Sequence, residues 1–111
     1  TMRLGGYRCS LSPESLARKI YGKEEIIERH RHRYEFNDFF KENLNSNGFI
    51  TSGVCPDNNL VEISEIKDHP FMIGSQFHPE FGSRLDKPHP LFDSFIKSCI
   101  NQKKIGAQFK L

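Results

Sequence analysis

This sequence of 111 residues lacks several features that mark large classes of protein. It has no tryptophan, and only 36% of its residues are hydrophobic, which is low against the roughly 45–50% apolar content of an ordinary globular domain. We therefore expect its hydrophobic surface to be completed by something else. The three cysteines are odd in number and show no Cys-x-x-Cys spacing. This argues against a disulfide scaffold or a zinc ribbon and fits a reducing, cytoplasmic compartment.

An excess of charge of one sign is also missing. Sixteen Lys and Arg residues against fourteen Asp and Glu leave a net charge of +2, so we predict neither a nucleic-acid partner nor a membrane partner. No apolar run approaches the length of a membrane span, and we recognise no signal peptide. The length suits one domain. Because the first residue is Thr1 rather than an initiator Met, we expect the chain to be a piece of a longer protein.

The clearest chemistry lies in residues 71–81. Phe71, Met72 and Ile73 are apolar and predict a buried strand, which Pro79 should end because it has no N–H to donate. His78 and Glu80 would then lie two residues apart on a turn that Pro79 stiffens. An imidazole beside a carboxylate is the base-and-orienter half of a nucleophilic triad. The alternative is a surface turn with a salt-bridged histidine.

A basic run over residues 24–36 is the second informative stretch. If it is extended, its side chains alternate between two sides: His30 and His32 on one, and Arg29, Arg31 and Arg33 on the other. The arginine row could bind carboxylates through its guanidinium groups. The alternatives are a solvated basic strand, a metal pair at the two histidines, and an RNA or phosphate patch. Three flanking arginines would repel a cation and no further ligand is obvious, so we predict no metal site.

Three helices are predicted. Ser12 as N-cap and Pro13 in the first helical position should begin one that Gly22 ends. Asn37 should cap a second, short helix. Pro90 should open the last, whose apolar face is formed by Leu91, Phe92, Phe95, Ile96, Cys99 and Ile100. We place Cys99 in the core and expect residues 102–111 to be a frayed tail.

Three strand-like runs follow the second helix, at residues 49–54, 60–66 and 71–77. They are separated by short stretches with the composition of turns. Because such short connections cannot hold a crossover, we predict an antiparallel meander.

Five segments, in this order, resemble the C-terminal part of the class I glutamine amidotransferase domain of the CTP synthase family: Thr-Met-Arg-Leu-Gly (1–5), Glu-Arg-His-Arg-His-Arg-Tyr-Glu (28–35), Leu-Val-Glu-Ile (60–63), His-Pro (69–70) and Gln-Phe-His-Pro-Glu-Phe (76–81). The His-Pro-Glu turn alone is common to class I amidotransferases. The first two segments are more specific. The resemblance covers roughly residues 1–100.

The resemblance implies an α/β, flavodoxin-like domain built on a largely parallel sheet. This chain would be its C-terminal part, with the antiparallel meander and the C-terminal helix. We place that part at residues 1–104 and a tail at 105–111.

The resemblance also implies a Cys-His-Glu triad that hydrolyses L-glutamine to glutamate and ammonia. His78 would be the general base and acid, Glu80 would orient it, and Arg33 would help to hold glutamine. The ammonia would pass to a separate synthetase domain, which aminates UTP to CTP with ATP and Mg. The implied partners are the upstream half of the amidotransferase domain and the synthetase domain, within a homotetramer. No cofactor is expected in this chain itself.

The sequence departs from the family at the nucleophile, which should lie on a Gly-x-Cys-x-Gly elbow. Cys9, Cys55 and Cys99 do not match that pattern, so we expect the chain alone to be inactive. Three hypotheses follow: a piece of a glutaminase, a non-catalytic glutamine-binding module, and an Arg-rich nucleic-acid binder. The intact His78 and Glu80 favour the first, because a binding module has no chemical need for them.

Overall fold

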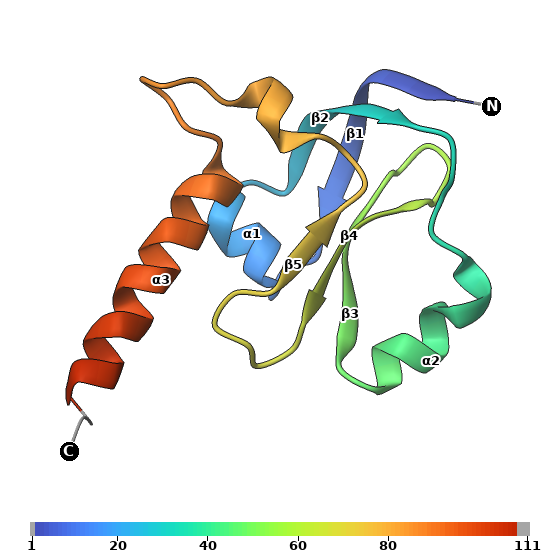
Figure 1. Ribbon diagram of the computed structural model, residues 1–111. Helices are drawn as coiled ribbons and strands as arrows, with labels where there is room; N and C mark the ends of the chain where they lie inside the picture. Colours follow the sequence, from blue (N-terminus) through green and yellow to red (C-terminus); the bar gives the residue numbers. More distant parts are fainter. Residues whose placement is uncertain (1, 109–111) are drawn as a thin grey trace.

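The computed structural model describes residues 2–108. A five-stranded sheet in the order β2-β1-β3-β4-β5 forms its centre, and one long helix reaches away from it (Figure 1). The strands are β1 (Arg3–Leu11), β2 (Glu25–His32), β3 (Phe49–Val54), β4 (Val61–Ile66) and β5 (Ile73–Ser75). The helices are α1 (Leu16–Tyr21), α2 (Lys41–Ser46) and α3 (Pro90–Gln108), with the 3₁₀ helices η1 (Asp38–Phe40) and η2 (Pro79–Gly82). In this part of the chain no helix combines the length and apolar character that a membrane span requires.

Every pair of neighbouring strands within residues 2–108 is antiparallel. The strands β3, β4 and β5 form the predicted meander, and the mixed α/β content with a C-terminal helix is also as predicted. β1 and β2 are also antiparallel, and the 6-residue helix α1 lies between them. The largely parallel sheet that the resemblance implies therefore does not lie in this part of the chain.

The strand β2 follows the predicted alternation. Ile26, Glu28 and His30 are buried, whereas Arg29 and Arg31 are exposed. The pairing with β1 runs from Arg3 opposite His32 to Ser10 opposite Glu25. Since β2 ends at His32, Arg33 lies just beyond it instead of in the strand.

Helix α1 begins three residues later than predicted. Its N-cap is Ser15, whose side chain accepts a hydrogen bond from the N–H of Arg18 at 3.0 Å. The Ser15 hydroxyl also donates a hydrogen bond to the carbonyl of Ser12 at 2.8 Å, so Ser12 lies in a turn that contains Pro13. The carboxylate of Glu65 accepts from the first two N–H groups of the helix at 2.8 and 3.2 Å. The local cap of Ser15 and the long-range contact of Glu65 together satisfy the N–H groups at the start of the helix. Gly22 ends it as predicted, with a left-handed φ of 66°.

The short helix after β2 is as predicted. The Asn37 side chain accepts from the N–H of Phe39 at 3.0 Å, and the chain continues through η1 and α2. Phe39 is 84% exposed and Phe40 is 50% exposed, so these side chains stay outside the core of the described residues.

The hydrophobic core lies where the sheet meets α1 and the first turn of α3. Its buried members are Cys9, Leu11, Ala17, Ile26, Ile63, Phe77 and Leu91. Gly53 in β3 passes so close to this core that an added Cβ would lie 2.8 Å from Cys9 Sγ and 2.9 Å from Ile63 Cβ. The pairing of β3 with β4 shifts its register at the same residue. The core therefore requires glycine at this position.

The strand before the His-Pro-Glu turn is shorter and more exposed than predicted. β5 covers only Ile73–Ser75, and Met72 is 50% exposed. Its exposure follows from its place at the edge of the sheet that residues 2–108 form. Pro79 begins η2 and does not terminate the strand.

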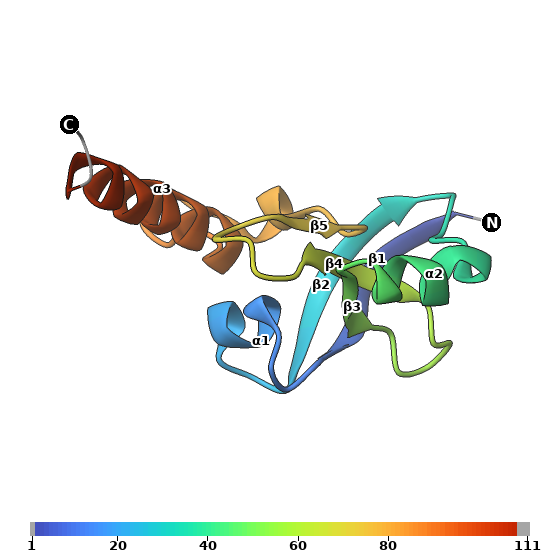
Figure 2. The ribbon, with the colours of Figure 1, turned by 90° about the horizontal axis from the view of Figure 1, so that it is seen from below.

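Helix α3 begins at Pro90 as predicted, but it continues to Gln108 where a frayed tail was expected. Residues 109–111 of that tail lie outside the described residues, and the boundary at residue 104 stays a prediction. Leu91 is buried, but most of the predicted apolar face is 41–56% exposed: Phe92, Phe95, Ile96 and Ile100. Cys99 is also exposed, so its placement in the core was wrong. The reason is that most of α3 extends beyond the sheet (Figure 2).

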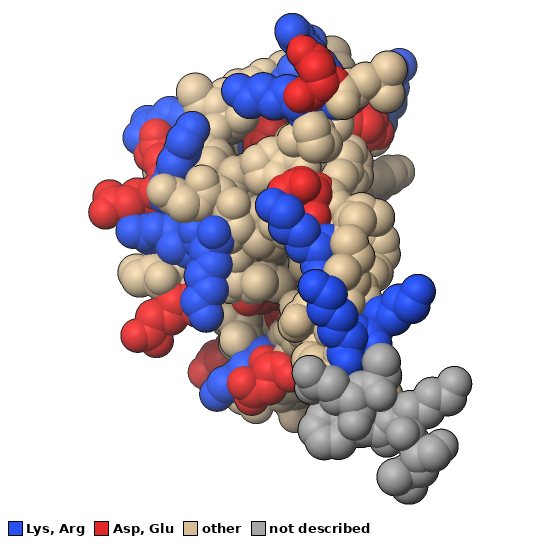
Figure 3. Space-filling model, turned by 90° about the vertical axis from the view of Figure 1, so that its left-hand side faces the viewer, with Lys and Arg blue, Asp and Glu red and all other residues tan. Residues whose placement is uncertain are grey.

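The side of the molecule that carries α3 has a mixed surface (Figure 3). Lys and Arg side chains border uncharged surface there. Ile105 near the end of α3 is 39% exposed. The long helix thus offers apolar side chains that the described residues do not cover.

Candidate active site

The turn that carries His78 is fixed by β2. The N–H of His78 donates to the carbonyl of Arg29 at 2.9 Å. Pro79 then begins η2, where its missing N–H leaves no donor unsatisfied. The N–H of Phe81 donates back to the carbonyl of His78 at 3.1 Å. These bonds hold the backbone on both sides of the predicted base.

The structure brings His78 and Glu80 together. His78 Nδ1 lies 2.9 Å from Glu80 Oε2, and the Phe81 ring stacks on the imidazole at 5.2 Å. The hydrogen bond to His78 lowers the pKa of Glu80, so this carboxylate is ionised at neutral pH. The two side chains are 38% and 56% exposed. The catalytic role of this pair stays a prediction.

The tautomer of His78 follows from this contact. Because an ionised carboxylate only accepts, Nδ1 carries the proton and donates it to Glu80. In the neutral imidazole Nε2 then has a free lone pair, and no described side chain or backbone group of the chain donates to it. A histidine in this state can take a proton from a nucleophile, while Glu80 stabilises the resulting imidazolium.

Arg33 is exposed in the segment that follows β2. Within the described residues, no hydrogen bond or ion pair joins it to His78 or Glu80. Its proposed contact with glutamine stays a prediction.

Within the described residues, no hydrogen bond joins a cysteine to His78. Cys9 and Cys55 are buried, and Cys99 is exposed on α3. Burial raises the pKa of Cys9 to about 12, which keeps this thiol protonated at neutral pH.

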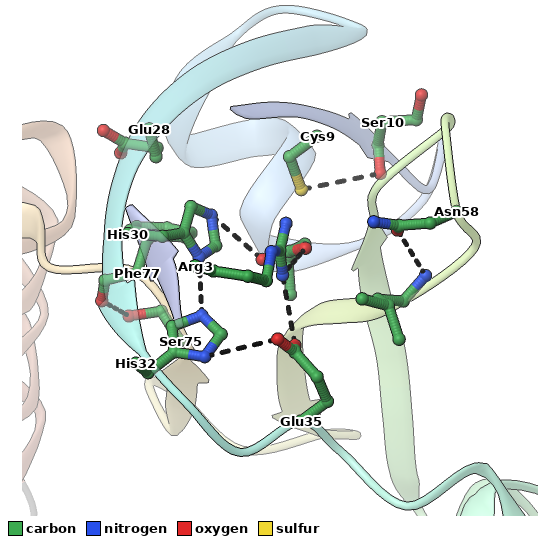
Figure 4. A network of polar contacts seen from close by, with 12 residues as sticks. Arg3, Cys9, Ser10, Glu28, His30, His32, Glu35, Asn58, Ser75 and Phe77 are labelled. Atoms are coloured by element: carbon green, nitrogen blue, oxygen red, sulfur yellow. Dashed lines mark hydrogen bonds and ion pairs between the residues drawn. The ribbon is translucent and has the colours of Figure 1, made fainter. Parts of the chain in front are cut away.

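A buried network that the sequence did not reveal lies beside the turn (Figure 4). We call it the buried ring; its members are Arg3, His30, His32, Glu35 and Glu62. Arg3 Nη1 lies 2.7 Å from Glu62 Oε1 and 3.1 Å from Glu35 Oε1. Glu62 Oε2 lies 3.0 Å from His30 Nε2, and His30 Nδ1 lies 2.8 Å from His32 Nε2. His32 Nδ1 closes the ring at 3.4 Å from Glu35 Oε2.

Part of the ring has the donor set of a metal site. Ligand atoms of His30, His32 and Glu62 lie within 4.8 Å of one another, and zinc accepts such residues. The expectation that no further ligand accompanies the two histidines was therefore wrong, because folding brings Glu62 to them. However, the Arg3 guanidinium already contacts Glu62 at 2.7 Å and would repel a cation. The predicted absence of a metal site stays a prediction.

A second buried acid–histidine pair holds the chain after η2. Glu28 Oε2 accepts from Tyr21 Oη at 2.6 Å and contacts His89 Nε2. The N–H of Leu91 donates to His89 Nδ1 at 3.1 Å, so Nε2 carries the proton that His89 donates to Glu28. The N–H of His89 donates to the Ser83 hydroxyl at 3.0 Å. This pair connects β2 to α3. Because both ring nitrogens of His89 have partners, this imidazole is not available as a base.

The sequence held weak signals for these buried groups. The alternation of β2 places Glu28 and His30 on its buried side, and Glu62 is a charged residue inside an apolar run. Charged residues are rarely buried without partners. Their partners are distant in sequence, so no spacing rule could have identified them.

A family model described as glutamine amidotransferase class-I matches residues 1–98. CTP synthase from Clostridium kluyveri is 55% identical over 103 residues, which are 93% of this chain and 19% of that protein. CTP synthase from Rubrobacter xylanophilus is 56% identical over 100 residues, which are 90% of this chain and 18% of that protein. The chain thus spans about a fifth of the length of these curated relatives.

The fold is similar to a solved structure described as the Trypanosoma brucei CTPS glutaminase domain with bound acivicin. The TM-score is 0.85 at 34% sequence identity, and the match covers 91% of this chain and 40% of that chain. These similarities agree with the resemblance seen in the sequence.

Proposed function

Because the chain belongs to the class I glutamine amidotransferase family, we propose that it supplies the base-and-orienter half of a site that hydrolyses L-glutamine to glutamate and ammonia. The observation that carries this proposal is the 2.9 Å contact of His78 Nδ1 with Glu80 Oε2. It leaves Nε2 free to activate a nucleophile. Arg33 would hold glutamine through its guanidinium group.

The nucleophile comes from elsewhere in this proposal. The burial of Cys9 and Cys55 and the absence of a Gly-x-Cys-x-Gly elbow support this assignment. By analogy with the CTP synthases that it matches, the chain would act in a cytoplasmic, homotetrameric enzyme with its upstream half and a synthetase domain. That domain would use the ammonia to aminate UTP with ATP and Mg.

A second candidate is a glutamine-binding module without catalysis. The burial of Cys9 and Cys55 favours it for the chain by itself, because a buried thiol is a poor nucleophile. The exposed His78–Glu80 pair favours hydrolysis, because binding alone needs no poised base.

The test is His78→Ala in the polypeptide that carries this chain together with a nucleophilic cysteine. The substitution removes the group that takes the thiol proton, so glutamine hydrolysis should fall by several orders of magnitude. Amination of UTP with added ammonia should be kept, since that step does not use His78. Loss of both activities in a folded variant would contradict the proposed role.

A further inference from the structure

The chain that follows the His-Pro-Glu turn returns to β2 at a buried cluster. We call this cluster the clamp; its members are Tyr21, Glu28 and His89. We propose that the clamp is a positioning device for the proposed site, because it fixes the backbone that holds Glu80 against His78. The effect on catalysis rests on the proposed hydrolysis of glutamine, whereas the effect on the His78–Glu80 contact can be measured without it.

The contact between His78 and Glu80 needs support from the backbone. Both side chains are partly exposed, and within the described residues no other side chain forms a hydrogen bond with either. An exposed pair of this kind contributes little stabilisation by itself. Glu80 therefore stays within hydrogen-bond distance only where the backbone of η2 places it. Whatever fixes η2 also fixes the orientation of the His78 imidazole.

The segment of residues 78–89 is attached to β2 at both of its ends. At its start, the N–H of His78 donates to the carbonyl of Arg29 at 2.9 Å. At its end, the His89 imidazole donates to the carboxylate of Glu28, which directly precedes Arg29. Within this segment only His89 is buried, and between η2 and α3 the chain loops away from the sheet (Figure 1). The two attachments therefore anchor the segment at neighbouring residues of β2.

The end of η2 lies directly against the clamp. The N–H of His89 donates to the hydroxyl of Ser83, the residue after η2, at 3.0 Å. The N–H of Ser83 donates in turn to the carbonyl of Glu80 at 3.3 Å. A Cβ added at Gly82 would lie 3.5 Å from His89 Cδ2 and 3.9 Å from Glu28 Oε1. A movement of His89 would thus reach Glu80 through hydrogen bonds and through direct contact.

The clamp itself is held by three elements of the fold. Glu28 on β2 and His89 before α3 are both buried. Glu28 Oε2 accepts from His89 and also from the hydroxyl of Tyr21, at the end of α1, at 2.6 Å. His89 Nδ1 accepts from the N–H of Leu91 at 3.1 Å, as the side chain of an N-cap residue does. The clamp resists displacement, because losing one partner would leave a buried polar group unsatisfied.

The alternative is a purely structural link between β2 and α3, and the two ring nitrogens of His89 separate these roles. Nδ1 caps α3, whereas Nε2 reaches Glu28. In His89→Asn the amide oxygen can replace Nδ1, but the side chain is too short to reach Glu28. In His89→Gln the amide nitrogen can replace Nε2, while the cap on α3 is lost. A positioning role requires the first variant to disturb His78 and the second to leave it in place.

The position of Glu80 can be read from the tautomer of His78. The contact with Glu80 keeps the proton of the neutral imidazole on Nδ1, and an imidazole without such a partner carries it mostly on Nε2 in water. Nitrogen-15 shifts of this ring, assigned by their loss in His78→Ala, are measured in the polypeptide that carries this chain together with a nucleophilic cysteine. His89→Asn should shift the ratio toward the Nε2 tautomer, and His89→Gln should restore the wild-type ratio. An unchanged ratio in folded His89→Asn would overturn the inference.

The effect on catalysis is measured in the same polypeptide. His89→Asn should lower kcat for glutamine by about 10–100-fold, because a misplacement of about 1 Å can cost about 100-fold in rate. KM should stay unchanged, since Arg33 lies beyond the other end of β2 and outside the clamp. His89→Gln should restore most of kcat. An unchanged kcat in His89→Asn, or equal losses of kcat in the two variants, would overturn the positioning role.

Gly53→Ala is the control for stability. An added Cβ there meets Cys9 and Ile63, neither of which belongs to the clamp or to residues 78–89. This variant should lower stability and leave both kcat and the tautomer of His78 unchanged. A comparable loss of kcat in Gly53→Ala would mean that stability and not position sets the rate, which would overturn the positioning role.

Ser83→Ala decides the question if His89→Asn does not fold. Ser83 is not buried, and its hydroxyl links η2 to the backbone of His89. Ser83→Ala should shift the tautomer of His78 in the same direction, while Ser83→Thr, which keeps a hydroxyl, should restore the wild-type ratio. A wild-type ratio in Ser83→Ala would then overturn the inference.

The proposed function and the clamp fail in different ways. If the wild-type polypeptide does not hydrolyse glutamine, the proposed function fails, and the tautomer ratios still decide whether the clamp positions Glu80. If hydrolysis is normal and His89→Asn keeps both kcat and the Nδ1 tautomer of His78, the clamp fails alone.

Discussion

At the scale of single residues, the His78–Glu80 pair is set by local chain geometry. Its members are two residues apart, and Pro79 between them starts the 3₁₀ helix that keeps them in contact at 2.9 Å. Arg33 is different, because its backbone depends on contacts far away in the sequence. The two kinds of residue should respond differently to substitution.

Arg33→Lys should weaken the use of glutamine. A guanidinium group matches a carboxylate with two parallel hydrogen bonds, and a lysine ammonium group does not. We expect kcat/KM for glutamine to fall by an amount that corresponds to about 1–3 kcal/mol of activation free energy, the usual contribution of a charged hydrogen bond. Steady-state kinetics with glutamine and with ammonia measure it, and only the glutamine reaction should change. Unchanged glutamine kinetics would mean that the arginine row is a solvated surface.

His30 makes stability depend on pH in the acid range. Its folded pKa is about 4, whereas an unfolded histidine has a pKa of about 6.5. Between these values the unfolded chain binds a proton that the folded chain does not, so the free energy of unfolding should fall as pH drops from about 6.5 to about 4. Urea unfolding at several pH values measures this slope. His30→Gln should reduce the slope. A slope in this variant as large as that of the wild type would refute the assignment.

At the scale of elements, the register of β3 depends on Gly53. An alanine Cβ there would meet Cys9 and Ile63 at less than 3.0 Å, and overpacking of this kind costs about 1–3 kcal/mol. Gly53→Ala should therefore lower the free energy of unfolding by about that amount. Gly74→Ala is the control, because an added Cβ on β5 meets nothing within 4 Å. Equal stability of the two variants in denaturant titrations would show that β3 can shift.

At the scale of the whole molecule, the chain is predicted to be inactive and only marginally stable by itself. A base without a nucleophile has nothing to activate. The exposed apolar side chains of α3 favour aggregation unless another surface covers them. Adding the upstream half of the amidotransferase domain in trans should sharpen the thermal melt and restore some release of ammonia from glutamine. A cooperative melt together with ammonia release from residues 1–111 alone would show that one of its own cysteines is the nucleophile.

Features that depend on short spacing could be predicted from the residues alone. The meander follows from short turns, the two sides of β2 follow from its alternation, and the His78–Glu80 contact follows from two residues around a proline. The family could also be predicted, because five short motifs occur in this sequence in the order that the family has them.

Features that join distant segments could not be predicted in this way, because they arise only when the sheet packs. At the start of α1, Glu65 on β4 accepts the first two N–H groups of the helix. The buried ring exists because β1, β2 and β4 bring Arg3, His30 and Glu62 together. No local pattern encodes such contacts, since a buried charge finds its partner through the packing of the sheet and not through its neighbours in the chain.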